Sequence, residues 1–338
     1  MRQTRLAAAA AASVALLGLP TQQAVAGGTA PTWTDSTPAI VPVVGNQVVT
    51  LTLTASDGDA GDTVHVEPVS GPAYARLVTE DGNPAVATVT VTAPRGIHGR
   101  IRLVVRARDA GGNAVLRELV LDAKPDTTPV SLVGPGEATR WAYVLARATA
   151  RSAPRATAHV VARVPTSTSL GSPNLVSVLQ ERYDAGGTLW VEANLAALPN
   201  GTTGWIRRSD LDAYHVVKTH LWIDRSRLTA RLTRNGVEVF RSRVGVGRGG
   251  TPTPGGTFYV RERLRGFDDP AYGPIAFGIS ARSATLTDWP GGGFVGIHGT
   301  NMPQLVPGRI SHGCIRMRNA DILRLARVLA LGTPVTIS

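Results

Sequence analysis

Short runs that alternate apolar and polar residues are the feature of this 338-residue chain that most restricts its fold. In QVVTLTLTAS (47–56), AVATVTVTAP (85–94) and RIRLVVRARD (100–109), every second side chain lies on one face. A period of two is typical of β-strands, and clusters of Gly, Asp and Asn between the runs are typical of turns. The chain is also long enough for two or three domains. It therefore predicts a mainly β, multidomain protein.

The first predicted domain covers residues 27–125. Its regular alternating runs and turns resemble those of immunoglobulin-like and cadherin-like bacterial surface modules, which implies an Ig-like β-sandwich. Asp57, Asp59 and Asp62 form an acidic cluster in one turn. Clustered carboxylates can bind calcium, but these three lack a complete ligand loop. A role in turn formation is therefore favoured, and no metal site is predicted.

The second predicted domain covers residues 126–215, after the linker-like KPDTTP (124–129). It shows short strand patterns and ends in PNGTTGWIRRSDL (199–211). This last segment resembles the final hairpin of bacterial SH3-like modules, which implies a small SH3-like barrel. Trp190 and Trp205 could line a binding groove or belong to the core, and the sequence leaves both roles open.

The third predicted domain covers residues 216–338. Its alternating runs joined by Asn235-Gly236 predict a β-hairpin. GGFVGIHGT (292–300) predicts a strand that ends at His298. One helix is predicted after the cysteine, with Asn319 as N-cap and a shared apolar face. That face comprises Ile322, Leu325, Ala326 and Leu329.

The N-terminus has the pattern of a cleaved secretory signal over residues 1–26. Arg2 and Arg5 precede an apolar run, and Ala24-Val25-Ala26 forms a small-residue cleavage site. An amphipathic or anchoring helix is the competing interpretation. The run is too short for a stable bilayer anchor, and no later stretch predicts a transmembrane helix in the mature chain. We therefore expect an exported protein of the cell wall, a periplasm-like space or the medium.

The positive charge is concentrated in one part of the chain. Residues 216–338 contain 17 Lys and Arg against 7 Asp and Glu, whereas residues 27–215 contain 16 against 17. A basic surface favours an anionic partner. Export argues against nucleic acid, so anionic cell-wall polymers or carboxylate-bearing wall peptides fit better. A solvated basic face without a partner is the alternative.

Cys314 is the single cysteine of the chain and cannot form an intramolecular disulfide. It is therefore a packing residue, an intermolecular link or a reactive thiol. A reactive thiol needs a histidine that takes its proton, which could give an ion pair. His312 lies two residues away on the same side of an extended segment, whereas His298 requires the fold to bring it near. Residue spacing alone leaves both candidates open.

The segments HGT (298–300) and SHGCIRM (311–317), with GVGRGGTPTPGGTF (245–258) upstream, resemble the signature of the L,D-transpeptidase family of cell-wall enzymes. The resemblance covers about residues 216–338 and implies a compact, mainly β catalytic domain. It implies Cys314 as nucleophile and His298 as general base, oriented by the Gly299 carbonyl. The remaining motif positions would shape the cysteine loop, supply oxyanion donors or hold substrate. We assign His312 and Gly313 to the oxyanion donors, and Ser311 and Arg316 to substrate binding.

The sequence thus predicts an exported L,D-transpeptidase that cross-links or remodels peptidoglycan stem peptides without a cofactor. An L,D-carboxypeptidase that uses water as acceptor is the alternative with the same chemistry. A zinc enzyme that uses His298, His312 and Cys314, or a non-catalytic wall-binding protein, are the alternatives from other classes. The five other histidines have no comparable context and are expected to be ordinary surface or core residues: His65, His98, His159, His215 and His220.

Overall fold

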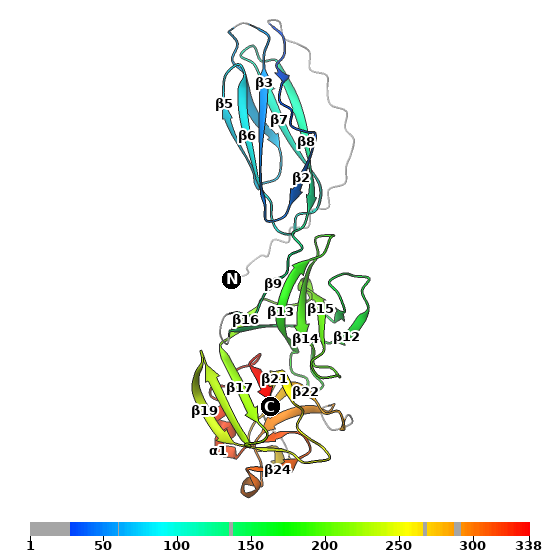
Figure 1. The fold of residues 1–338 in the computed structure, drawn as a ribbon, viewed down its shortest axis with the longest axis vertical. Coiled ribbons are helices and arrows are strands. Elements are labelled where there is room, and N and C mark those ends of the chain that lie inside the picture. Colours follow the sequence, from blue (N-terminus) through cyan, green and yellow to red (C-terminus); the bar gives the residue numbers. More distant parts are fainter. Residues whose placement is uncertain (1–27, 60, 135–137, 266–268, 287–291) are drawn as a thin grey trace, which may run out of the picture. The chain divides into compact units, whose positions relative to one another are not determined.

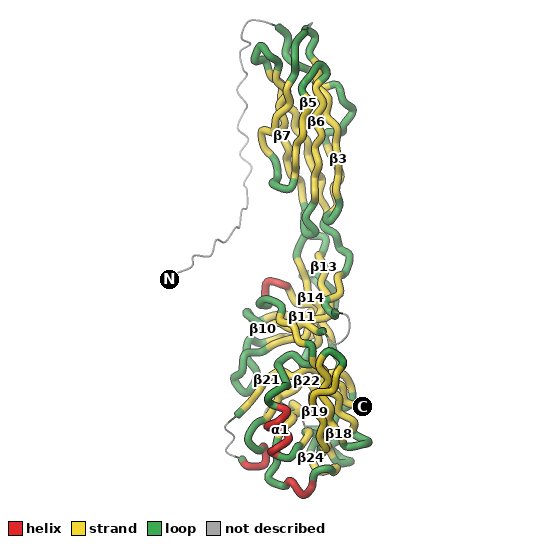
Figure 2. Tube along the Cα trace, turned by 90° about the vertical axis from the view of Figure 1, so that its left-hand side faces the viewer, coloured by secondary structure: helices red, strands yellow, loops and turns green. Residues whose placement is uncertain are grey.

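The computed structural model describes residues 28–338 except for 60, 135–137, 266–268 and 287–291. The chain divides into two compact units (Figure 1). Of the described residues, the first comprises 28–41, 49–91 and 101–121, and the second comprises 42–48, 92–100 and those after 121. Strands dominate both units (Figure 2), which confirms the mainly β prediction. No helix formed by the described residues is long and apolar enough to cross a bilayer. The predicted signal segment 1–26 lies outside the described residues.

The N-terminal part of the chain forms two four-stranded sheets, with the strand orders β1-β3-β6-β5 and β2-β8-β7-β4. In β6, Ala85, Ala87, Val89 and Val91 are at most 1% exposed, as the alternation predicts. The immunoglobulin-like assignment stays a prediction. The strands are β1 (Thr32–Trp33), β2 (Ile40–Val44), β3 (Val48–Ser56), β4 (His65–Ser70), β5 (Ala75–Glu80), β6 (Ala85–Thr92), β7 (Gly99–Arg108) and β8 (Ala114–Lys124).

The acidic cluster of the first unit follows β3. Asp57 Oδ1 accepts a hydrogen bond from the Asp59 amide at 2.8 Å, and Asp59 Oδ2 accepts one from the Thr29 amide at 2.7 Å. Carboxylate oxygens of Asp57, Asp59 and Asp62 lie within 4.8 Å of one another. The first two carboxylates therefore hold backbone amides, which is the turn role that the sequence favours.

The middle of the chain forms an eight-stranded sheet in the order β12-β11-β15-β14-β13-β10-β16, with β9 paired to β13. Trp190 and Trp205 are 1% and 8% exposed, so both belong to the core. The SH3-like assignment stays a prediction. The strands are β9 (Val130–Ser131), β10 (Thr139–Tyr143), β11 (Ala148–Arg151), β12 (Val160–Val164), β13 (Leu175–Tyr183), β14 (Leu189–Asn194), β15 (Thr203–Arg207) and β16 (His215–Val217), with the 3-10 helix η1 (Arg208–Asp210) before β16.

The C-terminal part forms a ten-stranded sheet in the order β19-β18-β17-β26-β21-β22-β23-β25-β20-β24. The predicted boundary between residues 215 and 216 falls inside β16, which pairs with β10. The elements are β17 (Thr219–Asp224), β18 (Thr229–Arg234), β19 (Val237–Arg243), β20 (Gly245–Gly247), β21 (Gly256–Leu264), η2 (Pro270–Tyr272), β22 (Ala276–Arg282), β23 (Phe294–His298), η3 (Pro303–Leu305), β24 (Gly308–Ser311), β25 (Ile315–Arg316), α1 (Asn319–Leu325) and β26 (Pro334–Ile337).

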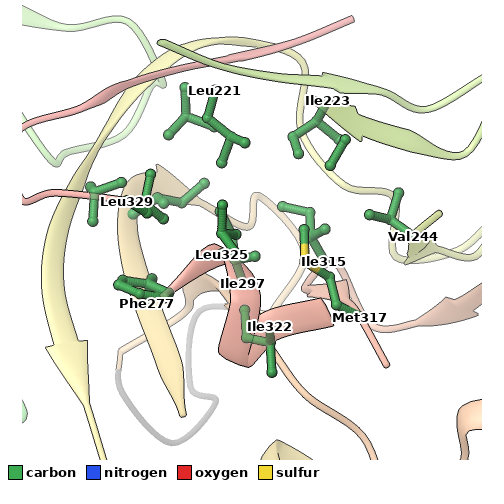
Figure 3. Close-up of a cluster of buried hydrophobic side chains, with 14 of the residues drawn as sticks. Leu221, Ile223, Val244, Phe277, Ile297, Ile315, Met317, Ile322, Leu325 and Leu329 are labelled. Atoms are coloured by element: carbon green, nitrogen blue, oxygen red, sulfur yellow. The ribbon is translucent and has the colours of Figure 1, made fainter. Parts of the chain in front are cut away.

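Helix α1 packs on the core of this sheet. Figure 3 shows Ile322 and Leu325 among the side chains of the surrounding strands, and the four residues of the predicted apolar face are all buried. The helix is shorter than predicted, because it ends at Leu325 and residues 326–328 form a turn. Asn319 is its first residue, with Arg318 at the N-cap position, so the predicted cap is wrong. The Asn319 side chain instead accepts a hydrogen bond from the Thr300 amide at 2.9 Å.

The eight-stranded and ten-stranded sheets belong to one compact unit and share a small apolar cluster. Trp141, Leu175 and Val217 pack against Tyr259 of β21, and Tyr259 is 1% exposed. The Tyr259 hydroxyl donates to the Leu175 carbonyl at 3.3 Å. Burial raises the pKa of Tyr259 to about 12, so the phenol stays neutral and can donate.

We expect Trp141→Ala to destabilise this unit strongly. The ring is 7% exposed and stacks on His215 at 4.3 Å, and truncation of a buried tryptophan typically costs about 3–5 kcal/mol. Urea unfolding followed by circular dichroism measures the loss. Leu145→Ala is the control, since Leu145 is 64% exposed and should change stability by less than about 0.5 kcal/mol. Equal, small effects of both substitutions would contradict the shared cluster.

Candidate active site

Two parallel strands bring the histidine and the cysteine segments together. Strand β23 pairs with β25 in the register Ile297 to Ile315 and His298 to Arg316. Ile297 and Ile315 are fully buried in the core (Figure 3). Because neighbouring side chains of a strand point to opposite faces, His298 and Arg316 lie on the other face. Cys314, one residue before β25, shares that face with them.

His298 is held in one tautomer by the backbone. Its side chain is buried, at 3% exposure, and Nδ1 lies 2.7 Å from the Gly299 carbonyl oxygen. A carbonyl only accepts, so Nδ1 carries the proton and Nε2 keeps a lone pair. Burial lowers the pKa of His298 to about 4. The hydrogen bond to Gly299 raises this pKa, whereas the Arg316 charge lowers it. The imidazole is therefore neutral at physiological pH and can act as a proton acceptor.

The Cys314 thiol lies in a partly shielded position. Its Sγ accepts a hydrogen bond from the Gly296 amide at 3.4 Å. Burial raises the pKa of the thiol, while the Gly296 bond and the Arg316 charge oppose this increase. Burial penalises the charged forms of both groups, so both pKa shifts favour a neutral thiol and a neutral imidazole. The ion pair that the sequence allows stays a prediction.

Gly296 separates the two side chains. A Cβ atom at this position would lie 3.7 Å from His298 Cδ2 and 3.9 Å from Cys314 Sγ. A larger residue would thus place a side chain between base and thiol. His298 and Cys314 line a cavity of about 210 Å³, and Tyr272 and Phe294 also line it. The Tyr272 ring centroid lies 5.0 Å from that of the His298 imidazole.

The cysteine loop is held by side chains of the same domain. Ser311 is 1% exposed, and its hydroxyl donates to the Cys314 carbonyl at 2.5 Å and accepts from the Gly313 amide at 3.1 Å. Gly313 has φ of +121°, which favours glycine. Both Ser311 bonds lie inside the loop, so this residue positions Cys314, and its predicted substrate contact stays a prediction. The Gly313 amide, a predicted oxyanion donor, is engaged by Ser311.

The Gly/Thr/Pro segment (245–258) forms hydrogen bonds to the cysteine loop. Thr253 is 1% exposed, and its hydroxyl donates to the Gly313 carbonyl at 2.8 Å. The same hydroxyl accepts from the Gly247 amide at 2.8 Å. In addition, the Arg248 amide donates to the Ser311 carbonyl at 3.0 Å. The segment therefore fixes the backbone that carries the thiol.

The two histidines of the motif have different surroundings. His312 Nε2 lies 2.6 Å from Arg248 Nη2. Since a guanidinium only donates, this nitrogen accepts the bond and is engaged at the surface. His298, in contrast, faces the same small space as Cys314 across Gly296. Among the described side chains, the cluster suited to a metal is the Asp57, Asp59 and Asp62 group, and it contains neither histidine.

The sequence predicts some residues of the site, and only the structure reveals the others. Arg316 was expected, and it lines the cavity with its Nε buried and without a partner. Tyr272 belongs to a 3-10 helix far from the motif in sequence, so spacing could not place it. Thr253 lies in a segment that the sequence singles out, yet only the fold shows which threonine reaches the loop. Asn319 supports the segment after Gly299 through Thr300.

Comparison with known proteins assigns the C-terminal domain. The family model for the L,D-transpeptidase catalytic domain, YkuD, matches residues 218–337. "Putative L,D-transpeptidase YkuD" of Bacillus subtilis (strain 168) is 32% identical over 124 residues, which cover 37% of this chain and 68% of that protein. The protein of the same name from Bacillus licheniformis is 35% identical over 95 residues, which cover 28% of this chain and 50% of that protein. The chain belongs to the L,D-transpeptidase family.

Solved structures of transpeptidases were also found. The catalytic domain from the E. faecium L,D-transpeptidase is 23% identical, covers 37% of this chain and 99% of that one, and has a TM-score of 0.27. The L,D-transpeptidase from Mycobacterium smegmatis is 10% identical, covers 92% of this chain and 100% of that one, and has a TM-score of 0.29.

We expect Thr253→Val to loosen the cysteine loop. Valine keeps the shape but leaves the buried Gly247 amide and Gly313 carbonyl without this partner, which should cost about 1–3 kcal/mol. Thr251→Val is the matched control, because its hydroxyl reaches the Ser311 carbonyl only at 3.5 Å. Denaturant unfolding and the rate of Cys314 acylation are measured for both. The interpretation fails if the control loses as much as Thr253→Val.

The low pKa of His298 predicts a stability that falls in mild acid. The unfolded histidine takes up a proton near its ordinary pKa of 6.5, whereas the folded one does so near about 4. Stability is therefore complete above pH 6.5 and declines as the pH falls toward 4. Between pH 7 and 5, the wild type should lose roughly 2 kcal/mol more than His298→Gln. Urea unfolding at both pH values measures this, and parallel losses would contradict the burial argument.

Proposed function

We propose that this chain is an exported L,D-transpeptidase that acts on peptidoglycan stem peptides through a thioester on Cys314. The observation that carries the proposal is the placement of His298 and Cys314 on one face of neighbouring parallel strands, on either side of Gly296. The similarity to the two Bacillus proteins named as L,D-transpeptidases supports the reaction class. The basic charge of residues 216–338 supports a substrate that bears carboxylates.

The first half-reaction transfers an acyl group to sulfur. Cys314 Sγ attacks the carbonyl of the amide between the L-centre of a diamino acid and a terminal D-residue. His298 Nε2 takes the thiol proton as the S–C bond forms, because both groups are neutral at rest. The C–N bond then breaks, and the leaving D-amino acid receives the proton from His298. The Gly299 carbonyl keeps the imidazole oriented and stabilises its transient charge.

The second half-reaction releases the acyl group. An amine from another stem attacks the thioester and gives a cross-link, with His298 taking its proton and returning one to sulfur. Water in the same place gives an L,D-carboxypeptidase product, which is the second candidate function. We assign oxyanion stabilisation to the backbone amides of His312 and Cys314, because the Gly313 amide donates to Ser311. Arg316, whose Nε is unpartnered, is assigned to substrate binding.

The remaining parts of the chain are assigned to export and placement. Residues 1–26 are proposed to be a signal peptide that directs the mature protein to the cell wall or an extracytoplasmic space. The Ig-like (27–125) and SH3-like (126–215) modules are proposed to hold the catalytic domain, from residue 216 onward, near its substrate. The signal-peptide assignment is tested by measuring the mass of the secreted protein. The expected mass is that of a chain that begins at residue 27 or 28.

We expect Cys314→Ala to abolish turnover and Cys314→Ser to nearly abolish it. Alanine has no nucleophile, and a serine hydroxyl is far harder to deprotonate than a thiol. Purified protein is incubated with a defined stem tetrapeptide, and the products are read by mass spectrometry. A shorter peptide, a cross-linked dimer or both distinguish the water and amine acceptors. Most of the wild-type turnover in Cys314→Ala would refute the mechanism.

Substitution of each motif histidine tests the choice of base. His298→Ala should lower kcat by on the order of 10²–10⁴-fold, the usual scale of general acid–base catalysis. His312→Ala keeps its backbone amide and should cost less. Circular dichroism confirms the fold of both variants. A larger kcat loss in a folded His312→Ala protein would assign the base to the other histidine.

A further inference from the structure

Arg261 is a buried arginine that the transpeptidase reaction described above does not use. It lies in β21, and its side chain is 4% exposed. Strand β21 pairs with β22 as Val260 to Ile279 and Glu262 to Gly278, so Arg261 is the additional residue of a β-bulge. Bulges redirect a side chain away from the regular alternation of a strand.

The Arg261 guanidinium has few partners for a buried cation. Nη2 donates to Asn174 Oδ1 over 3.4 Å, whereas Nε and Nη1 are buried without a hydrogen-bond partner. None of the ion pairs between described residues includes Arg261. Glu262, next in the chain, accepts from the Thr168 hydroxyl at 2.7 Å. Since arginine stays charged in proteins, an unpaired buried guanidinium is costly unless an anion joins it.

Arg261 lines a cavity of about 360 Å³ next to the active site. Its wall includes polar residues, among them Ser167, Thr168 and Asn174, together with Tyr259 and Arg261. Phe294 lines both this cavity and the one that contains Cys314 and His298. The Arg261 guanidinium carbon lies 4.1 Å from the centroid of the same ring. One aromatic side chain thus separates a cationic cavity from the reaction site.

We propose that this cavity is a binding subsite for a free carboxylate of the stem peptide, with Arg261 as its principal ligand. The inference rests on the proposed function and names a part of the substrate that is recognised away from the reacting amide. A planar guanidinium carries its N–H donors in a fixed fork geometry that matches the two oxygens of a carboxylate. The hydroxyl and amide side chains of the wall add neutral partners. Arg261 is therefore a specificity residue.

Paired substrates and variants test this subsite. The substrates are a synthetic stem tetrapeptide with all carboxylates free and a set in which each carboxylate is amidated in turn. Arg261→Met should raise KM for the free peptide by on the order of 10–100-fold, the scale of a lost charge-assisted bond, and leave kcat nearly unchanged. One amidated peptide should show the same loss with wild-type enzyme and no further loss with Arg261→Met. Arg263→Met is the control, since Arg263 is exposed two residues further along the same strand.

Binding and stability separate this proposal from the proposed function. The affinity of the free tetrapeptide for Cys314→Ala protein is measured by calorimetry. The double variant with Arg261→Met should bind more weakly, and the double variant with Arg263→Met should bind as well as Cys314→Ala alone. Arg261→Met should not lower the urea midpoint, because it removes an unpaired buried charge, whereas loss of a purely structural arginine would lower it. If Arg261→Met does not fold, Arg261→Lys, which keeps the charge without the fork, should show weaker binding in calorimetry.

Unchanged calorimetric affinity in Arg261→Met, or equal losses on every amidated peptide, would overturn the subsite. Displacement of the peptide by millimolar inorganic phosphate, with no dependence on any single carboxylate, would also overturn it in favour of a phosphate site. Absence of turnover with every peptide would refute the transpeptidase assignment alone, because the calorimetric comparison does not require chemistry.

Discussion

The parallel pairing of β23 with β25 is the contact on which the active site depends. Its register sets His298 opposite Arg316 and places Cys314 beside Gly296. The pairing is fixed by Ile297 and Ile315, which are fully buried and anchor both strands in the core. A slip by one residue would turn His298 into that core and the isoleucines toward the cavity. Apolar packing on one face therefore determines the chemistry on the other.

Burial of the pair has a direct chemical consequence. Burial shifts the pKa values of the thiol and the imidazole so that each group favours its neutral form. In the proposed mechanism, proton transfer is coupled to attack on the substrate, where the developing oxyanion and the imidazolium can stabilise each other. The Gly299 carbonyl contributes by fixing the proton on Nδ1 before any substrate is bound. Orientation, more than a lowered thiol pKa, is what this site provides.

The loop that carries the thiol is held in place by hydroxyl groups that take no part in the proposed reaction. Ser311 and Thr253 each use one hydroxyl as both donor and acceptor, and together they hold the backbone on both sides of Gly313. Arg261 differs, because it lies at a β-bulge as a buried cation and its Nε and Nη1 have no hydrogen-bond partner. Satisfied polar groups thus mark the supporting structure, and unsatisfied ones mark the place where a ligand is expected.

The sequence by itself determined the strand-rich architecture, since the period of two is local and needs no partner strand. It also predicted Cys314 and His298 as the reacting pair, because the segments HGT and SHGCIRM resemble the signature of a known family. Residue spacing alone could not distinguish His298 from His312 as the partner of Cys314, because pairing between distant strands is a tertiary property. Only the structure shows that Ser311 bonds within its own loop, that Asn319 supports Thr300 instead of capping its helix, and that burial shifts the pKa values of the thiol and the imidazole. Those outcomes depend on burial and on contacts between segments far apart in the chain, which no short stretch of residues encodes.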